Sequence, residues 1–277
     1  MNFELLPQDC ISHILSCTSP RDACRSGLVS TTVRHAGDSD SVWEKFLPSD
    51  YQEILSRLVS PLVFASKKEL YSKLCRPLLI DEGRKSFSIS KTTGEKGYTL
   101  SARNLSITWS SNALYWSWKP LLQSRFAETV ELRTICWLEI QGKISTCMLS
   151  PKTTYRAYLI VKFADRAYGL DALPSEVSVV VGKHQSQGIA YLRRPESNRP
   201  TLERVCFLNR IEALRSKVSK GEERVPHERE DGWFEVELGE FYNDGGDEEV
   251  KMSLREVKGV HLKGGLIVEG IEIRPKD

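Results

Sequence analysis

Three of the six tryptophans in this chain lie within ten residues of one another, in the stretch ITWSSNALYWSW at positions 107–118. Trp109, Trp116 and Trp118 are accompanied by Tyr115, and a polar turn at 110–112 separates the first from the others. A protein core uses aromatic side chains but seldom places a polar turn among them. A binding face combines flat apolar rings with hydrogen-bonding groups. Both interpretations are open from the residues alone.

The spacing of the aromatic residues favours packing for several of them. Trp109 alternates with Leu105 and Ile107, as a residue on the inner face of a strand would. If the segment is extended, Trp118 shares the face of Trp116. Strand aromatics usually pack in a core, so we interpret three tryptophans as packing residues: Trp118, Trp137 and Trp233.

Residues that would carry bond chemistry are not arranged for it. The five histidines show neither H-x-x-x-H nor H-E-x-x-H spacing, and no G-x-S-x-G, phosphate-binding loop or G-x-G-x-x-G occurs. Glu235 and Glu237 alternate on what reads as a solvated strand face. We therefore predict a binding protein that is not an enzyme and needs no cofactor or metal.

Composition sets further limits on the class of protein. The chain has 277 residues, enough for two domains, and a formal net charge of +2. Its basic residues form only short clusters such as Arg193-Arg194, so it has no basic stripe for nucleic acid. No apolar run approaches the ~20 residues that a membrane helix needs. The N-terminus carries Glu4 and Asp9 and is a poor signal peptide. We expect no nucleic-acid or membrane partner.

The seven cysteines indicate a reducing compartment. Their number is odd and no C-x-x-C pair occurs. Cys10, Cys17 and Cys24 recur every seven residues, but Pro20 interrupts any continuous helix through them. We interpret them as free thiols and expect a cytoplasmic and nuclear protein.

The chain changes from helical to strand periodicity near residue 97. Before it, Ile11, Ile14 and Leu15 share a helix face, and Ser19–Pro20 begins a second helix. After it, segments such as TYRAYLIVKFAD, GWFEVELGEFY and EVKMSLREV alternate with period two, and GLIVEGIEIRP shifts phase at Gly270, as a bulge does. We read HQSQG and YLRRPESNRP as loops. The stretch RIEALRSKVSKGEERVPHERED at 210–231 starts helical and then turns highly charged, and we read it as an exposed insertion.

The fold class predicted is α+β and multidomain. A small all-α motif at 1–48 precedes a helical linker at 49–96. An all-β antiparallel sandwich of jelly-roll type occupies 97–277. A motif of about 50 residues buries little apolar surface by itself, so its apolar helix faces suggest a partner.

Residues 2–48 resemble a plant-type F-box. The resemblance rests on Leu6-Pro7, Asp9, Ile14-Leu15, Ser19-Pro20, Asp22, Arg25, Leu28-Val29, Ser30, Trp43, Phe46 and Leu47. It implies docking on a Skp-type adaptor of a cullin–RING ubiquitin ligase. The alternative is a helical cap whose aliphatics pack on the sandwich. The expected adaptor-binding residues are Leu6, Pro7, Ile11, Ile14, Leu15, Leu28, Val29 and Val33.

Residues 97–277 resemble the phloem-lectin (Nictaba-like) family, through segments such as LSARNLSITWSSNALYWSWKP and DGWFEVELGEF. The resemblance implies a sandwich that binds N-acetylglucosamine-containing glycans. Its two sugar-contacting tryptophans are seven residues apart, a pattern that Trp109 and Trp116 fill. An indole would lie on the C–H face of a pyranose, and a carboxylate from Glu230, Glu235, Glu237 or Glu240 would accept hydrogen bonds from the sugar's hydroxyl groups.

Three functions follow as hypotheses. The first is an F-box subunit of an SCF-type ubiquitin ligase that captures targets through a glycan. The second is the same adaptor recognising a polypeptide, with a vestigial sugar site. The third is a free cytoplasmic lectin without a role in a ligase.

Overall fold

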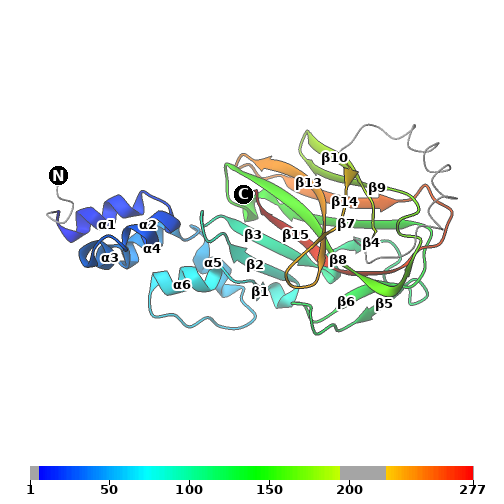
Figure 1. Cartoon of the computed structure of the whole chain (residues 1–277), viewed down its shortest axis with the longest axis horizontal. Coiled ribbons are helices and arrows are strands. Elements are labelled where there is room, and N and C mark those ends of the chain that lie inside the picture. The colour runs from blue at the N-terminus through cyan, green and yellow to red at the C-terminus, as the bar shows by residue number, and fades with distance from the viewer. Residues whose placement is uncertain (1–5, 194–222, 277) are drawn as a thin grey trace.

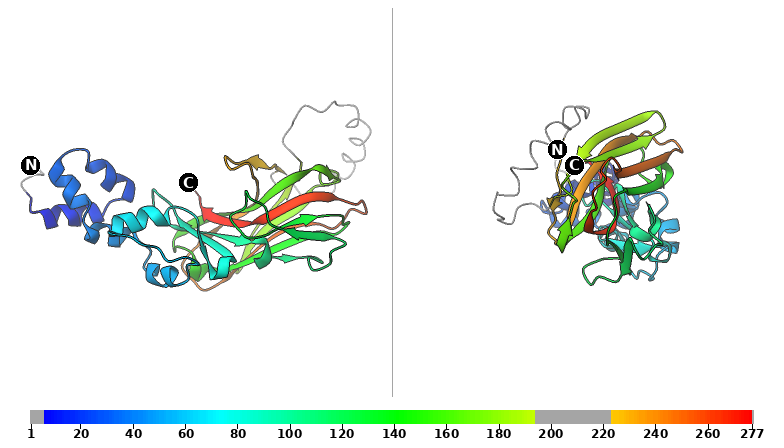
Figure 2. Two further views of the ribbon diagram at one scale, coloured as in Figure 1. Left: turned by 90° about the horizontal axis from the view of Figure 1, so that it is seen from below. Right: turned by 90° about the vertical axis from the view of Figure 1, so that its right-hand side faces the viewer.

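A computed structural model describes residues 6–193 and 223–276. Four helices form a lobe at one end of an elongated molecule, two more helices lie between this lobe and the sheets, and the sheets make up the rest (Figures 1 and 2). The helical lobe followed by an antiparallel β-domain confirms the predicted fold class.

The helices are short, and local capping chemistry sets where three of them begin. Ser19, Ser30 and Ser66 each accept a backbone N–H with the side-chain oxygen, and Pro20 takes the first helical position after Ser19, as predicted. The helices are α1 (Gln8–Ser16), α2 (Pro20–Ser26), α3 (Thr31–Gly37), α4 (Asp40–Phe46), α5 (Tyr51–Ser56) and α6 (Lys67–Leu74).

The larger sheet, here sheet A, contains nine strands. Its main path runs β1 (Leu78–Ile80), β2 (Lys85–Ile89), β3 (Lys96–Ser101), β15 (Gly264–Pro275), β8 (Thr153–Tyr168), β13 (Phe234–Asn243) and β12 (His227–Glu228). Strand β6 (Thr129–Leu132) also pairs with β15, and β5 (Trp116–Lys119) pairs with β6.

The smaller sheet, here sheet B, contains six strands. In order these are β11 (Glu223–Arg224), β10 (His184–Ala190), β9 (Ser175–Val181), β14 (Glu249–Glu256), β7 (Leu138–Ser145) and β4 (Ser106–Ile107). Every ladder between named strands is antiparallel except that between β10 and β11. Three short 3-10 turns complete the described elements: η2 (Asp81–Gly83), η3 (Ala102–Asn104) and η4 (Thr146–Met148).

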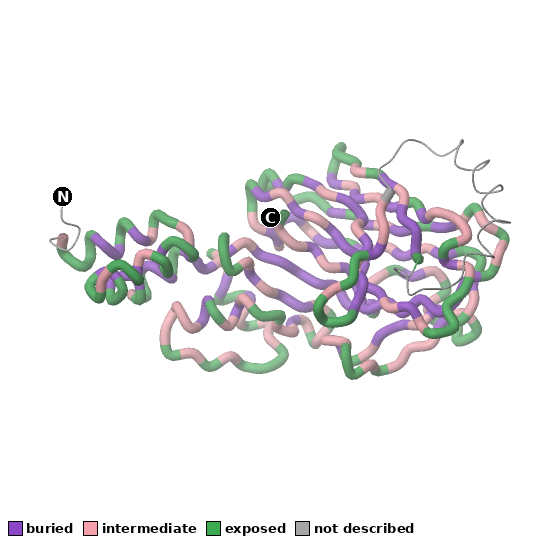
Figure 3. Tube along the Cα trace, viewed as in Figure 1, coloured by how far each residue is buried: buried purple, intermediate pink, exposed green. Residues whose placement is uncertain are grey.

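The core lies between the two sheets, as the strand alternation predicts (Figure 3). Val250, Met252 and Leu254 of β14 are buried, while Lys251 and Arg255 are exposed. The phase shift in β15 is confirmed as a bulge at Gly270, where pairing with β6 ends and pairing with β3 begins. A Cβ at Gly270 would lie 1.9 Å from the Leu100 carbonyl oxygen, so only glycine allows this approach.

The segment expected as a helical linker is only partly helical. Helices α5 and α6 occupy its first half, but β1 and β2 belong to sheet A and pair onward to β3. The sandwich therefore begins near residue 78, about twenty residues before the predicted boundary at 97. The cause is that β1 and β2 are short and lie beside helices, so they show too little period-two pattern.

Other expectations for single segments were also wrong or lie outside the described residues. HQSQG forms part of β10, an outer strand whose polar side chains face solvent, rather than a loop. The expected strand SARNLSITW holds only the last residue of β3, the turn η3 and the two residues of β4. Most of YLRRPESNRP, and the predicted insertion up to residue 222, lie outside the described residues. The end of the predicted insertion holds the short strands β11 and β12.

Candidate functional site

Three of the residues predicted to bind the adaptor pack inside the helical lobe instead. Ile11 and Leu15 of α1 and Val33 of α3 are almost fully buried. Helix α1 packs against α3 and α4, so the face carrying Ile11 and Leu15 becomes the lobe's own core. These three are corrected to packing residues, because a buried side chain cannot also contact a partner in this conformation.

The other predicted adaptor residues remain accessible. Leu28 and Val29 are 78% and 81% exposed, Pro7 and Ile14 are exposed, and Leu6 is half-buried. Leu28 and Val29 lie on the turn between α2 and α3. Their backbone N–H groups donate to the Arg25 and Ser26 carbonyls, at 3.0 Å each. A folded lobe that holds two adjacent aliphatic side chains in water has an unpartnered apolar surface.

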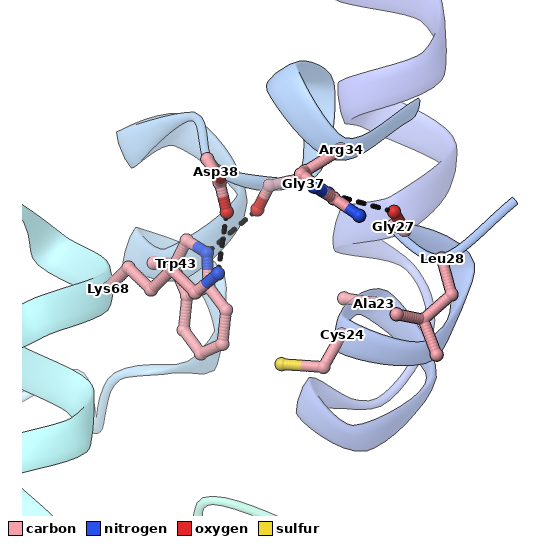
Figure 4. A pocket seen from close by; sticks show the side chains of 9 residues that line it. All are labelled: Ala23, Cys24, Gly27, Leu28, Arg34, Gly37, Asp38, Trp43 and Lys68. Atoms are coloured by element: carbon pink, nitrogen blue, oxygen red, sulfur yellow. Dashed lines mark hydrogen bonds and ion pairs between the residues drawn. The ribbon is translucent and has the colours of Figure 1, made fainter. Parts of the chain in front are cut away.

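A hollow of about 180 Å³ adjoins this turn (Figure 4). Leu28 and Cys24 border it on one side and Trp43 on the other, and Cys24 points toward the Trp43 ring. The Trp43 indole N–H donates to the Gly37 carbonyl at 2.8 Å, and Lys68 of α6 pairs with Asp38 at 2.6 Å. The hollow is therefore walled by fixed side chains next to the exposed aliphatics.

The tryptophan-rich stretch forms the connection from β4 in sheet B to β5 in sheet A. These strands lie on the part of the sandwich away from the helical lobe (Figure 1). The Asn112 N–H donates to the Trp109 carbonyl at 2.9 Å, and the Asn112 side-chain oxygen accepts from the Leu114 N–H at 2.9 Å. The polar residues 110–112 thus close a turn that carries the aromatic side chains.

Trp109 has an unusual backbone conformation. Its φ is +57°, in the left-handed region that bulky residues seldom adopt. Its side chain is 51% exposed, and its ring lies against Tyr115 with centroids 5.2 Å apart. Strained backbone of this kind concentrates at functional sites. Together, the strain and the exposure make Trp109 the best candidate for ligand contact in this stretch.

Trp116, the other predicted sugar-contacting residue, is buried. Its side chain is 1% exposed, and its indole N–H donates to the Thr108 carbonyl at 2.9 Å. A ring enclosed in this way cannot lie on a pyranose, so the prediction of sugar contact is corrected to packing. The reason is that β5 starts at Trp116 and directs it into the core, whereas Trp109 precedes the turn.

The tryptophans predicted to be packing residues divide into three cases. Trp233 is buried, as predicted, and its indole N–H donates to the Gln123 carbonyl at 3.0 Å. Trp118 is half-buried, with the Arg103 guanidinium 3.6 Å from its ring centroid. Trp137 is 42% exposed, so the expectation that it lies in the core was wrong.

The carboxylates expected to complete the sugar site are largely engaged elsewhere. Glu235 pairs with Arg274 at 2.8 Å and Arg229 at 3.0 Å. Burial opposes its ionisation, but the hydrogen bond from Arg274 and the two positive charges outweigh burial and lower the pKa of Glu235. Glu237 and Glu240 also form ion pairs with arginines, while Glu230 is exposed.

Glu139 is a carboxylate that the sequence reasoning overlooked. Its backbone carbonyl accepts the Thr108 N–H at 3.1 Å, so it lies beside the start of the tryptophan turn. Its side chain accepts the Trp137 indole N–H at 3.3 Å. The W-x-E spacing of Trp137 and Glu139 on one strand face was the signal that could have identified them.

Comparison with known proteins gives two family matches along the chain. The model of phloem protein 2 matches residues 95–275, and that of the F-box domain matches residues 3–45. The chain belongs to the phloem protein 2 family. In Arabidopsis thaliana, F-box protein PP2-B15 is 50% identical over 98% of this chain and 96% of its own length. F-box protein PP2-B13 is 48% identical over 98% of both chains, and F-box protein VBF is 48% identical over 98% of this chain and 99% of its own.

Membership of this F-box and phloem protein 2 group has consequences for function. F-box proteins are generally substrate adaptors of ubiquitin ligases and not catalysts, and an F-box implies a Skp-type partner in an SCF-type complex. Among the described residues, no cluster of side chains suits a metal ion, and no helix has the length and apolarity to span a membrane.

Proposed function

We propose that this F-box protein recruits substrates to an SCF-type ubiquitin ligase and that its sandwich captures them through N-acetylglucosamine-containing glycans. The observation that carries the glycan half is the exposed Trp109 ring, held by a strained turn and supported by Tyr115. A cytoplasmic and nuclear location is part of this proposal.

The adaptor half of the proposal is supported by the apolar surface of the helical lobe. Leu28 and Val29 protrude from a turn whose backbone is fixed by hydrogen bonds. Burying each side chain against a partner would contribute ~1.5–3 kcal/mol. The hollow beside Leu28 gives a protruding side chain of the adaptor a place to insert.

The glycan half is supported by the chemistry of the turn. One face of an exposed indole offers an apolar surface to the C–H groups of a pyranose. Ser110, Ser111 and Asn112 supply polar groups within the same turn. A residue in a strained conformation is held in place before the ligand arrives, so less conformational freedom is lost on binding.

The arrangement of the two surfaces suits an adaptor. The F-box lobe lies at one end of the molecule, and the β4–β5 connection lies toward the other. A target on the sandwich and an adaptor on the lobe would not compete for space. The protein would then raise the effective concentration of the target near a conjugating enzyme brought by other subunits.

The test uses the full chain co-purified with a Skp-type adaptor and a glycan array. We expect binding to N-acetylglucosamine oligomers or N-acetyllactosamine-type glycans, and binding about ten-fold weaker in Trp109→Ala. The conservative variant Trp109→Tyr serves as the control, since it keeps an aromatic face. If the folded complex with the adaptor binds no glycan on the array, glycan capture is rejected.

A second candidate is recognition of a polypeptide by the same turn. Because Trp116 is buried, Trp109 is the only exposed indole of the pair, where the family pattern predicts two. Leu114, in the same connection between β4 and β5, is strongly exposed. Polypeptide recognition predicts target capture that free sugars do not compete with but that Trp109→Ala abolishes. A free lectin, the third hypothesis, predicts that the chain does not co-purify with the adaptor.

A further inference from the structure

Trp137 is an exposed tryptophan outside the predicted sugar pair. It directly precedes β7, whose residues Leu138 and Ile140 are fully buried between the sheets. Because side chains alternate along a strand, Trp137, Glu139 and Gln141 belong to the outer face of sheet B. The hydrogen bond from the indole N–H to Glu139 at 3.3 Å holds the polar edge of the ring, and 42% of the side chain remains accessible.

The outer face beside Trp137 is lined by hydrogen-bonding groups. Glu139 accepts the Gln141 amide N–H at 2.7 Å and pairs with Arg255 of β14 at 3.1 Å. Across the sheet, Ser253 of β14 lies opposite Gln141, and its hydroxyl bonds that of Ser178 on β9 at 2.9 Å. Amide and hydroxyl groups therefore recur at the interstrand spacing of about 4.8 Å.

The composition of this face favours a hydroxyl-rich ligand over a protein. A protein interface has an apolar centre with several aromatic or aliphatic anchors. Here one aromatic ring adjoins a row of polar side chains, and the charges of Glu139 and Arg255 neutralise each other. A neutral oligosaccharide matches both parts, because it stacks its C–H face on a ring and exchanges hydrogen bonds along its rim.

The face adjoins the chain segment that carries Trp109. The segment carrying Trp109 and Tyr115 runs beside the segment carrying Trp137. The Thr108 N–H donates to the Glu139 carbonyl at 3.1 Å and joins these two segments, while the bond from the Arg133 N–H to the Tyr115 carbonyl at 2.8 Å extends the pairing of β5 with β6. Trp109 directly follows Thr108, and Trp137 lies two residues before Glu139, so both tryptophans are close in sequence to the hydrogen bond that joins β4 to β7.

We infer that Trp137, with Glu139, Gln141 and Ser253, forms a second carbohydrate subsite that extends the Trp109 site, so that the domain binds a neutral oligosaccharide across two tryptophans. This inference rests on the proposed glycan-binding function. It assigns the role of the second exposed ring to Trp137, in place of the buried Trp116.

The experiment measures dissociation constants of N-acetylglucosamine oligomers, from one to four units, for the full chain in complex with a Skp-type adaptor. Trp109→Ala should weaken binding of every length. Trp137→Ala should leave the monomer unchanged and weaken the tetramer about ten-fold, the effect of losing one stacking contact. Trp137→Phe should retain most of the tetramer affinity, and Ser253→Ala should lose part of it.

The controls separate this inference from the proposed function. Lys143→Ala changes an exposed residue farther along β7 and should bind all lengths normally. Equal affinity of wild type and Trp137→Ala for all four lengths would overturn the subsite and leave Trp109 as a single-sugar site. If wild type binds no length, both proposals fail. Loss of target capture in Trp137→Ala with unchanged sugar affinity would also overturn the subsite and assign this face to a polypeptide.

Discussion

Trp109 and Trp116 are seven residues apart and chemically identical, yet 51% of one side chain is exposed and 1% of the other. The difference comes from the backbone between them. The left-handed conformation at Trp109 turns the chain before the ring can enter the sandwich, and β5 then returns the chain with Trp116 inward. A pairing inferred from spacing alone cannot distinguish these two positions.

The two tryptophans should therefore respond oppositely to truncation. Trp116→Ala removes a fully buried ring and should cost about 3–5 kcal/mol of folding stability. Trp109→Ala should weaken glycan binding about ten-fold while thermal melting changes little. Melting curves and glycan titrations of both variants in the adaptor complex check this. Equal destabilisation by the two substitutions would show that Trp109 is also a packing residue.

Residue roles were predictable from sequence only where local chemistry determines them. Ser19 and Pro20 define a helix start in any context, and the bulge at Gly270 follows from a broken alternation. Exposure of Trp137 and burial of Ile11 depend instead on which faces meet in three dimensions. Periodicity identifies an apolar face but does not state whether the chain itself or a partner covers it.

At the scale of elements, substitutions in the turn between α2 and α3 should change adaptor binding without changing the stability of the fold. Leu28→Ser with Val29→Ser should change the unfolding free energy by less than about 1 kcal/mol, because both side chains are already in water. The double variant should weaken adaptor affinity at least a hundred-fold if both side chains are buried in the complex. Co-purification and calorimetry with a Skp-type adaptor measure this.

Two comparison variants make the result specific. Val260→Ser changes an even more exposed aliphatic on the sandwich and should bind the adaptor normally. Ile11→Ser places a hydroxyl in the core of the lobe and should unfold it. Normal adaptor binding by the Leu28 and Val29 double variant would contradict the assignment of this turn.

A second element-scale prediction concerns the contact between α5 and the β1–β2 turn. Arg57, at the end of α5, forms two hydrogen bonds to Asp81, each 2.9 Å long. The hydrogen bonds from Arg57 lower the pKa of Asp81 to about 2, from an ordinary 3.8. Both side chains are about three-quarters buried, so this pair links the helical segment to sheet A.

The lowered pKa of Asp81 determines how folding stability changes with pH. Ionised Asp81 stabilises the fold above its unfolded pKa, by roughly 2 kcal/mol, and the contribution is lost as the pH falls from about 4 through about 2. Asp81→Asn keeps a side chain that tolerates the positive φ of this position. The stability gap between wild type and Asp81→Asn should be largest near pH 7 and shrink by roughly half at pH 3. A gap independent of pH in chemical denaturation would contradict this role for the ion pair.

At the scale of the whole molecule, the helical lobe, α5–α6 and the sandwich share one continuous core. Trp43 of α4 contacts Tyr71 of α6, with ring centroids 5.1 Å apart, and the Tyr71 hydroxyl donates to the Ser90 carbonyl at 2.9 Å. Lys96 of β3 pairs with Asp50 at 3.0 Å. The change in sequence periodicity marks where helices give way to long strands, but packing continues across it.

Fragment boundaries test the part of this continuity that joins β1 and β2 to the sandwich. A fragment of residues 97–277 lacks β1 and β2, so β3 keeps its pairing with β15 but loses that with β2 and becomes an exposed edge strand. A fragment of residues 49–277 keeps α5, α6 and the whole of sheet A. We expect the longer fragment to be monomeric with a cooperative melting transition, and the shorter one to aggregate, as size-exclusion chromatography and thermal melting would show.

The phloem protein 2 match begins at residue 95 and so omits the same two strands. A monomeric, cooperatively melting 97–277 fragment would mean that β1 and β2 are accessory to the sandwich rather than part of its folding unit.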